Sequence, residues 1–63
     1  MGVTNMNGFY AIYAHTPHKK YLLMSTNNQE FVKPAQILLE QMRKHGFLAS
    51  GITSITVEFE QEM

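Results

Sequence analysis

Two histidines three residues apart, His15 and His18, form the nearest approach to a metal-binding motif in this chain. Imidazoles at this spacing can reach one metal ion from a turn, but a site needs further ligands. The chain has no cysteine, its first acidic residue is Glu30, and its third histidine, His45, lies in another predicted element. We therefore expect exposed turn histidines, with no metal ion and no other cofactor.

Catalytic residues of the usual kinds are missing from the composition. The chain contains no cysteine and no aspartate, and its three serines have no histidine and carboxylate context of the triad kind. Gly46 and Gly51 fit a helix end and a turn, and their spacing does not match a phosphate-binding loop. Because a nucleophile, a base and an orienting group cannot all be named, we expect no enzymatic activity.

Three tyrosines lie close in sequence to a pair of lysines, Lys19 and Lys20. Tyr10, Tyr13 and Tyr21 could stack bases on a sheet surface, as single-stranded nucleic-acid binders do. The formal net charge is zero, which argues against a broad phosphate-binding surface. A nucleic-acid-binding dimer that uses Lys19, Lys20 and Tyr21 is therefore kept as the alternative function.

Glu58, Glu60 and Glu62 alternate along the last predicted strand and its tail. Side chains two residues apart on a strand lie ~7 Å from each other, so this acidic row could occupy a basic groove on another protein. It could equally be a charged edge that discourages aggregation. On the predicted helix, Ile37 and Gln41 face outward and are further candidates for a partner site.

The length, 63 residues, indicates one domain whose small core gives it only marginal stability. Disulfides are excluded because cysteine is absent, so we expect self-association into a homodimer. The N-terminus has neither a basic start nor a long apolar run, which predicts a cytoplasmic protein. Residues 1–8 are expected to form a flexible lead-in to a domain spanning residues 9–63, with either Met1 or Met6 as the start.

Three segments have strand patterns. The segment from Ile52 to Gln61 alternates strictly, with Thr53, Ile55, Val57 and Phe59 on one side and polar residues on the other. The segment from Phe9 to His15 is apolar on both sides. Lys20 to Thr26 is a second strand, and Pro17 marks the turn that joins it to the first as a hairpin.

A helix follows the hairpin. Pro34 suits its first turn, and Gly46 is expected to end it in a left-handed conformation. The residues at helical spacing that we expect on its buried face are Phe31, Ala35, Leu38, Leu39 and Met42.

These elements predict an α+β fold of order β-β-α-β. It is a three-stranded antiparallel sheet of strand order 2-1-3 with one helix packed on one face. We place the first strand at the centre because only that strand is apolar on both sides. One helix covers one face, so either Tyr10 and Ile12 or Ala11 and Tyr13 should be left on an uncovered, sticky face.

The sequence thus indicates a small non-enzymatic protein-binding domain, a regulator or inhibitor that occupies a partner's surface. Short chains of this type often come from phages or other mobile elements. The expected partners are a second copy of the chain and an unidentified protein. The residues expected to contact a partner are Tyr10, Ile12, Tyr13, Ile37, Gln41, Glu58 and Glu60.

Overall fold

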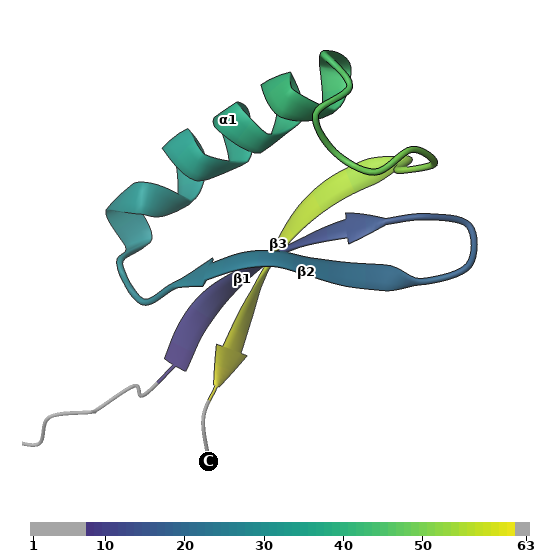
Figure 1. Ribbon diagram of the computed structural model, residues 1–63. Coiled ribbons are helices and arrows are strands. Elements are labelled where there is room, and N and C mark those ends of the chain that lie inside the picture. The colour runs from purple at the N-terminus through teal and green to yellow at the C-terminus, as the bar shows by residue number, and fades with distance from the viewer. Residues whose placement is uncertain (1–7, 62–63) are drawn as a thin grey trace, which may run out of the picture.

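The computed structural model describes residues 8–61 and contains three strands, a short 3-10 helix and one α-helix. The strands are β1 (Gly8–His15), β2 (Lys20–Thr26) and β3 (Ser54–Gln61), and the helices are η1 (Gln29–Phe31) and α1 (Val32–Lys44). The sheet has the order β2-β1-β3, with β1 antiparallel to both neighbours (Figure 1). The predicted α+β fold and strand order are therefore confirmed.

The boundaries differ slightly from those expected. Gly8, which we assigned to the lead-in, begins β1 and pairs with Gln61. A side chain at Gly8 would collide with the Phe59 ring, because a Cβ there would lie 2.5 Å from it. The rest of the expected lead-in, including Met1 and Met6, lies outside the described residues.

The hairpin turn is closed by Thr16. Its backbone N–H donates to the Lys19 carbonyl at 2.8 Å, and its Oγ1 accepts from the backbone N–H groups of His18 and Lys19. Pro17 lies inside this turn, where its fixed φ is compatible with the chain reversal. The turn sets β1 and β2 side by side, with His15 opposite Lys20.

One β-bulge interrupts this pairing. Ile12 lies opposite Met24 and Tyr13 opposite Leu22, so Leu23 has no partner on β1. A bulge of this kind increases the local twist and changes which residues of the bulged strand share a face.

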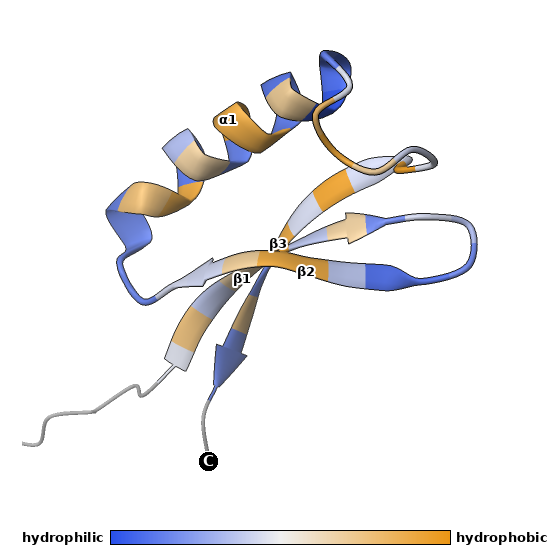
Figure 2. Cartoon of the chain, in the orientation of Figure 1, coloured by the Kyte–Doolittle hydropathy of each residue, from blue (hydrophilic) through white to orange (hydrophobic). Residues whose placement is uncertain are grey.

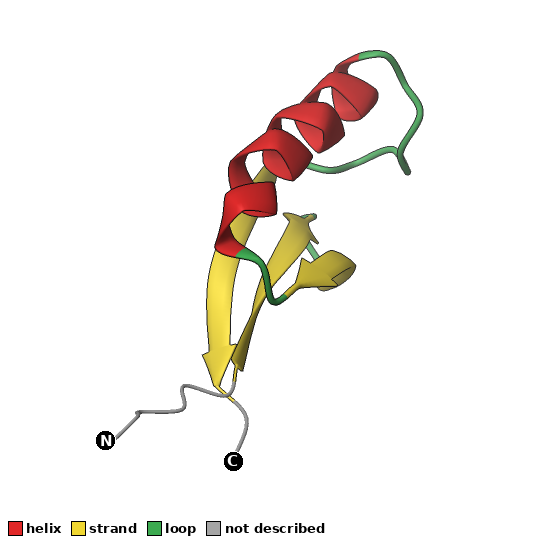
Figure 3. Cartoon of the chain, turned by 90° about the vertical axis from the view of Figure 1, so that its left-hand side faces the viewer, coloured by secondary structure: helices red, strands yellow, loops and turns green. Residues whose placement is uncertain are grey.

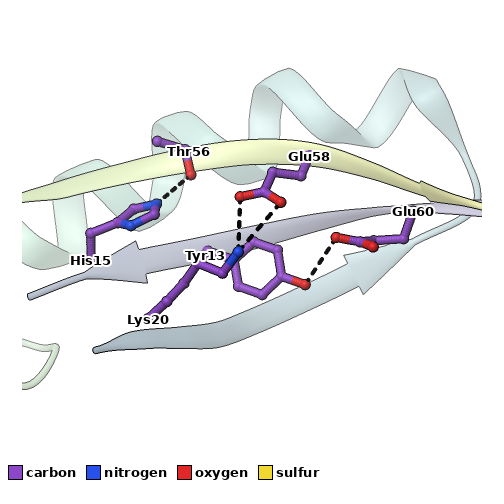
Figure 4. Close-up of polar contacts among 6 residues, drawn as sticks. All are labelled: Tyr13, His15, Lys20, Thr56, Glu58 and Glu60. Carbon is purple, nitrogen blue, oxygen red and sulfur yellow. Dashed lines mark hydrogen bonds and ion pairs between the residues drawn. The ribbon is translucent and has the colours of Figure 1, made fainter. Parts of the chain in front are cut away.

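The central strand supplies most of the core. Ala11, Ile12 and Ala14 are fully buried, and Ile55 on β3 is 5% exposed. The register places Ile55 opposite Ala14, so these two side chains lie on one face of the sheet. The helix α1 lies over one side of the sheet (Figure 3), and the side chains of Tyr13 and Thr56 point away from it (Figure 4), so Ala14 and Ile55 point toward α1.

The helix begins and ends as its sequence predicts. Asn28 Oδ1 accepts from the backbone N–H of Glu30 at 2.9 Å and so caps η1, which leads directly into α1. At the other end Gly46 has φ +80°, the backbone N–H of Phe47 donates to the Met42 carbonyl, and that of Gly46 to the Arg43 carbonyl. This pair of bonds is a Schellman motif, which confirms Gly46 as the helix stop.

The helix packs differently from expectation. It lies mainly against β3, where the Gln36 side chain donates to the Ile55 carbonyl at 3.5 Å. The Arg43 side chain donates to the carbonyl of Ile52, in the segment that precedes β3, also at 3.5 Å. No residue of α1 is buried, and Phe31 and Leu38 are each 59% exposed. The predicted burial of these two side chains is therefore wrong, because α1 turns a neighbouring side toward β3.

Candidate partner-binding face

The sheet face turned away from α1 carries two groups of polar contacts contributed by all three strands (Figure 4). We call it the polar sheet face and define it by Tyr13, His15, Lys20, Thr56, Glu58 and Glu60. The register explains the grouping, since Tyr13 lies opposite Thr56 and His15 lies opposite Lys20. Residues directly opposite each other in an antiparallel pair point to the same side.

Tyr13 is the centre of this face. Its hydroxyl donates to Glu60 Oε2 at 3.2 Å, and the Lys20 ammonium lies 4.3 Å from the centroid of its ring (Figure 4). Lys20 Nζ also lies 3.2 Å from Glu58 Oε2, in an ion pair whose side chains are 45% and 39% exposed. The ring is thus held between a cation and a carboxylate on a partly exposed surface.

The environment of Tyr13 also affects its ionisation. Its pKa is raised above the usual 10.0, chiefly by desolvation and then by the Glu60 carboxylate. Nearby Lys20 acts in the opposite direction but does not prevail. Tyr13 therefore remains a neutral hydrogen-bond donor at physiological pH.

His15 contacts a strand neighbour and not another histidine. Its Nε2 lies 2.7 Å from Thr56 Oγ1, while His18 is exposed in the turn. Within residues 8–61, no three or more His, Asp, Glu or Cys side chains are grouped so that they could hold a metal ion. The contact with Thr56 holds the His15 side chain against the surface of the sheet.

The structure separates the residues that we expected to bind a partner. Tyr13, Glu58 and Glu60 lie together on the polar sheet face. Tyr10 lies on the other face, in an edge-to-face contact with Phe59 at 5.0 Å between centroids. Ile12 is fully buried, so its side chain is not exposed to a partner on either face.

The two helical candidates form a separate surface. Ile37 is 53% exposed, and Gln41, one turn later, is also exposed. Both lie on the outer side of α1, away from β3. They cannot contact the same small ligand surface as Tyr13, because the sheet lies between them.

The expected uncovered face is less apolar than predicted. Of the two possibilities, the side with Ala11 and Tyr13 is the one turned away from α1. Ala11 is nonetheless fully buried, and Leu22, which lies opposite Tyr13 on β2, is 57% exposed on this side. The face therefore combines polar contacts with one exposed leucine.

Lys19 and Lys20, the lysines of the alternative function, both contact side chains within this chain. Lys19 Nζ lies 5.0 Å from the centroid of the Tyr21 ring, and Lys20 is paired with Glu58. Sequence reasoning did not assign His15, Lys20 and Thr56 to one site with Glu58 and Glu60. The alternation along β1 and β3 contained that signal, but only the register combined it.

No helix in residues 8–61 has the length and apolar character needed to cross a membrane. Comparison with known protein families, curated proteins and solved structures finds no match to this chain.

Proposed function

We propose that this protein is a non-enzymatic protein-binding domain that regulates or inhibits a partner by occupying its surface through the polar sheet face. The observation that carries this proposal is the placement of Tyr13 between Lys20 and Glu60 on the side of the sheet that α1 leaves uncovered. Tyrosine is enriched in protein interfaces because it offers a large rigid ring together with a polar end.

The charges of this face suggest the chemistry of the partner. Glu58 is neutralised by Lys20, whereas Glu60 accepts only the hydroxyl of the neutral Tyr13 among the described contacts. A carboxylate that is 3.2 Å from a hydroxyl still has lone pairs available for a second donor. A partner with an arginine or lysine at the matching position would complete this arrangement.

The same charges weigh against the alternative, a nucleic-acid-binding dimer. Two carboxylates share the face with Tyr13, and they would repel a phosphate backbone. Lys20 would have to leave Glu58, and Lys19 would have to leave the Tyr21 ring, before either could serve a nucleic acid.

A double charge reversal, Glu58→Lys with Glu60→Lys, tests the proposal. Glu30→Lys is the matched control, because Glu30 is an exposed glutamate on η1 and distant from the polar sheet face. Capture from a lysate of the source organism should recover a protein with wild type and with Glu30→Lys but lose it with the double reversal. Circular dichroism should be unchanged in all three.

Equal capture by the double reversal and wild type would refute a role for the acidic side chains. A heparin or single-stranded DNA column tests the alternative in parallel. Retention of wild type that falls steeply with salt supports nucleic-acid binding, whereas flow-through at low salt argues against it.

A further inference from the structure

One position on the polar sheet face is already filled by a cation that belongs to the chain itself. The Lys20 ammonium lies 3.2 Å from Glu58 Oε2 and 4.3 Å from the centroid of the Tyr13 ring (Figure 4). An aromatic ring and a carboxylate both attract a cation. Glu60 adjoins this position, because its Oε2 accepts the Tyr13 hydroxyl at 3.2 Å. We call the position the cation site, with Tyr13, Glu58 and Glu60 as its walls.

Lys20 fills the cation site incompletely. It reaches the ring from β2, and among the described residues it pairs with Glu58 and not with Glu60. Both side chains of that pair are partly exposed. An exposed ion pair changes an equilibrium by roughly fivefold or less. A better-fitting cation from another molecule can therefore displace Lys20.

An arginine side chain fits the cation site better than a lysine does. Its guanidinium is flat, so it stacks on an aromatic ring, and its N–H donors spread to both sides. A guanidinium over Tyr13 can therefore donate to Glu58 and Glu60 together, whereas the Lys20 ammonium contacts only Glu58. A partner lysine would replace one ammonium by another, so the exchange favours arginine.

An exposed apolar side chain lies beside the cation site. Leu22 is opposite Tyr13 in the pairing of β1 with β2 and points to the same side, two residues along β2 from Lys20. Figure 2 shows this change along β2, from a hydrophilic end at the hairpin turn to an apolar middle. In an extended segment, side chains two residues apart lie about 7 Å from each other on one side. An apolar residue two places from the arginine of a partner can therefore contact Leu22.

We propose that the partner of this face presents an arginine with an apolar residue beside it, and that Lys20 is an internal competitor for the place of that arginine. The arginine displaces the Lys20 ammonium from the Tyr13 ring and pairs with Glu58 and Glu60, while the apolar residue packs on Leu22. Arginine recognition at this site rests on the function proposed above, because it names what the polar sheet face binds.

Lys20→Met and Lys19→Met form a matched pair that tests the competition. Each change removes one positive charge from an exposed lysine that lies over a tyrosine ring. Lys19, however, contacts Tyr21, which points to the other side of the sheet, and no carboxylate within residues 8–61 pairs with it. Circular dichroism should be unchanged in both variants.

The probe is the peptide acetyl-Leu-Gly-Arg-Gly-Leu-amide, with binding followed by NMR signals of the Tyr13 ring. Its leucines lie two places on either side of the arginine, so either chain direction presents one of them to Leu22. Lys20→Met should bind the peptide about two- to fivefold more tightly than wild type does, as expected for removal of an exposed pair. Lys19→Met should bind it as wild type does.

Two further peptides show whether the guanidinium itself is recognised. Citrulline in place of the arginine keeps the shape and removes the charge, and lysine keeps the charge and removes the fork of donors. Both should bind Lys20→Met more weakly than the arginine peptide does. Adding Glu60→Gln to Lys20→Met should also weaken arginine binding, whereas adding Glu30→Gln, on η1, should not.

Equal affinities of Lys20→Met and Lys19→Met for the arginine peptide would overturn the proposal. So would citrulline binding as tight as arginine binding, or no binding of the arginine peptide to Lys20→Met. Lysate capture with the Glu58 and Glu60 reversal tests the proposed function separately. If capture is lost in the reversal but the peptides show no preference for arginine, the face binds its partner without an arginine in the cation site.

Discussion

Tyr13 shows how much a single residue of this protein depends on its neighbours. Its hydroxyl needs Glu60 from β3 and its ring needs Lys20 from β2, so it joins all three strands on one side of the sheet. Lys20 comes from the other strand of the hairpin, whereas Glu60 lies 47 residues away in sequence. Tyr13 therefore has both a hydrogen bond to a carboxylate and a cation over its ring, which an isolated surface tyrosine lacks.

The ionisation of Tyr13 should affect stability at alkaline pH. Its pKa in the folded protein is raised above 10.0, so folding favours the protonated form. That contribution is fully present below pH 10 and is lost as the pH rises through the folded-state pKa. We expect urea midpoints of wild type to fall above pH 10 and those of Tyr13→Phe to fall less.

Ultraviolet titration of tyrosinate gives a direct check. One tyrosine of wild type should ionise later than the others, and that late phase should be missing in Tyr13→Phe. A titration in which both proteins show identical profiles would show that Tyr13 is not shielded by Glu60.

The burial of Ile12 gives a second prediction at this scale. Ile12→Ala removes methylene and methyl groups from a fully buried site and should cost about 2–5 kcal/mol, similar to the whole stability of a core this small. Ile37→Ala is the control at 53% exposure and should change stability by about 0.5 kcal/mol or less. Urea unfolding distinguishes them, and comparable losses would mean that the facing of β1 is wrong.

At the scale of elements, α1 is defined by its ends more clearly than by its packing. Asn28 initiates the helical segment through η1, and Gly46 terminates it by a Schellman motif. Between them the helix contacts β3 through only part of its apolar surface. Its position is therefore set by the connections as much as by the core.

The helix end can be tested with Gly46→Ala. Gly46 has φ +80°, and an added Cβ would meet no atom within 4 Å, so the cost is purely conformational. We expect a loss of about 1 kcal/mol in unfolding free energy. Gly46→Asn should lose less, since asparagine tolerates this conformation better than alanine. Equal stability of all three proteins would argue that the helix does not end there.

The described part of the molecule, residues 8–61, has a small core and several large apolar side chains on its surface. The central strand β1 is paired with a strand on each side, but one helix is too small to cover the whole sheet. The large apolar residues left exposed include Leu22, Phe31 and Leu38. In a chain of 63 residues this leaves little margin for independent stability.

If association completes the fold, then stability should depend on concentration. We expect the thermal midpoint of wild type to rise with protein concentration, because a partner that binds only the folded state stabilises it by mass action. A concentration-independent wild-type midpoint would indicate that one chain folds alone.

Much of the architecture could be read from local patterns. The two-sided apolar character of Phe9 to His15 predicted the central strand, because a strand in the middle of a sheet is buried more fully than one at its edge. The period of two placed Ile55 and Val57 on one side of β3 and Glu58 and Glu60 on the other. Pro17 and Gly46 marked a turn and a helix end because their backbone preferences are local.

The tertiary structure decided which faces were covered and what each face contained. Alternation assigns residues to two sides of a strand, but it does not say which side receives the helix. That choice buried Ile12 and left Tyr13 open. The bulge at Leu23 changed the faces along β2, and the position of α1 over β3 exposed Leu38. These outcomes depend on contacts between segments up to 47 residues apart, as Tyr13 and Glu60 show. No local pattern contains them, because they arise only when the register and the helix position are set together.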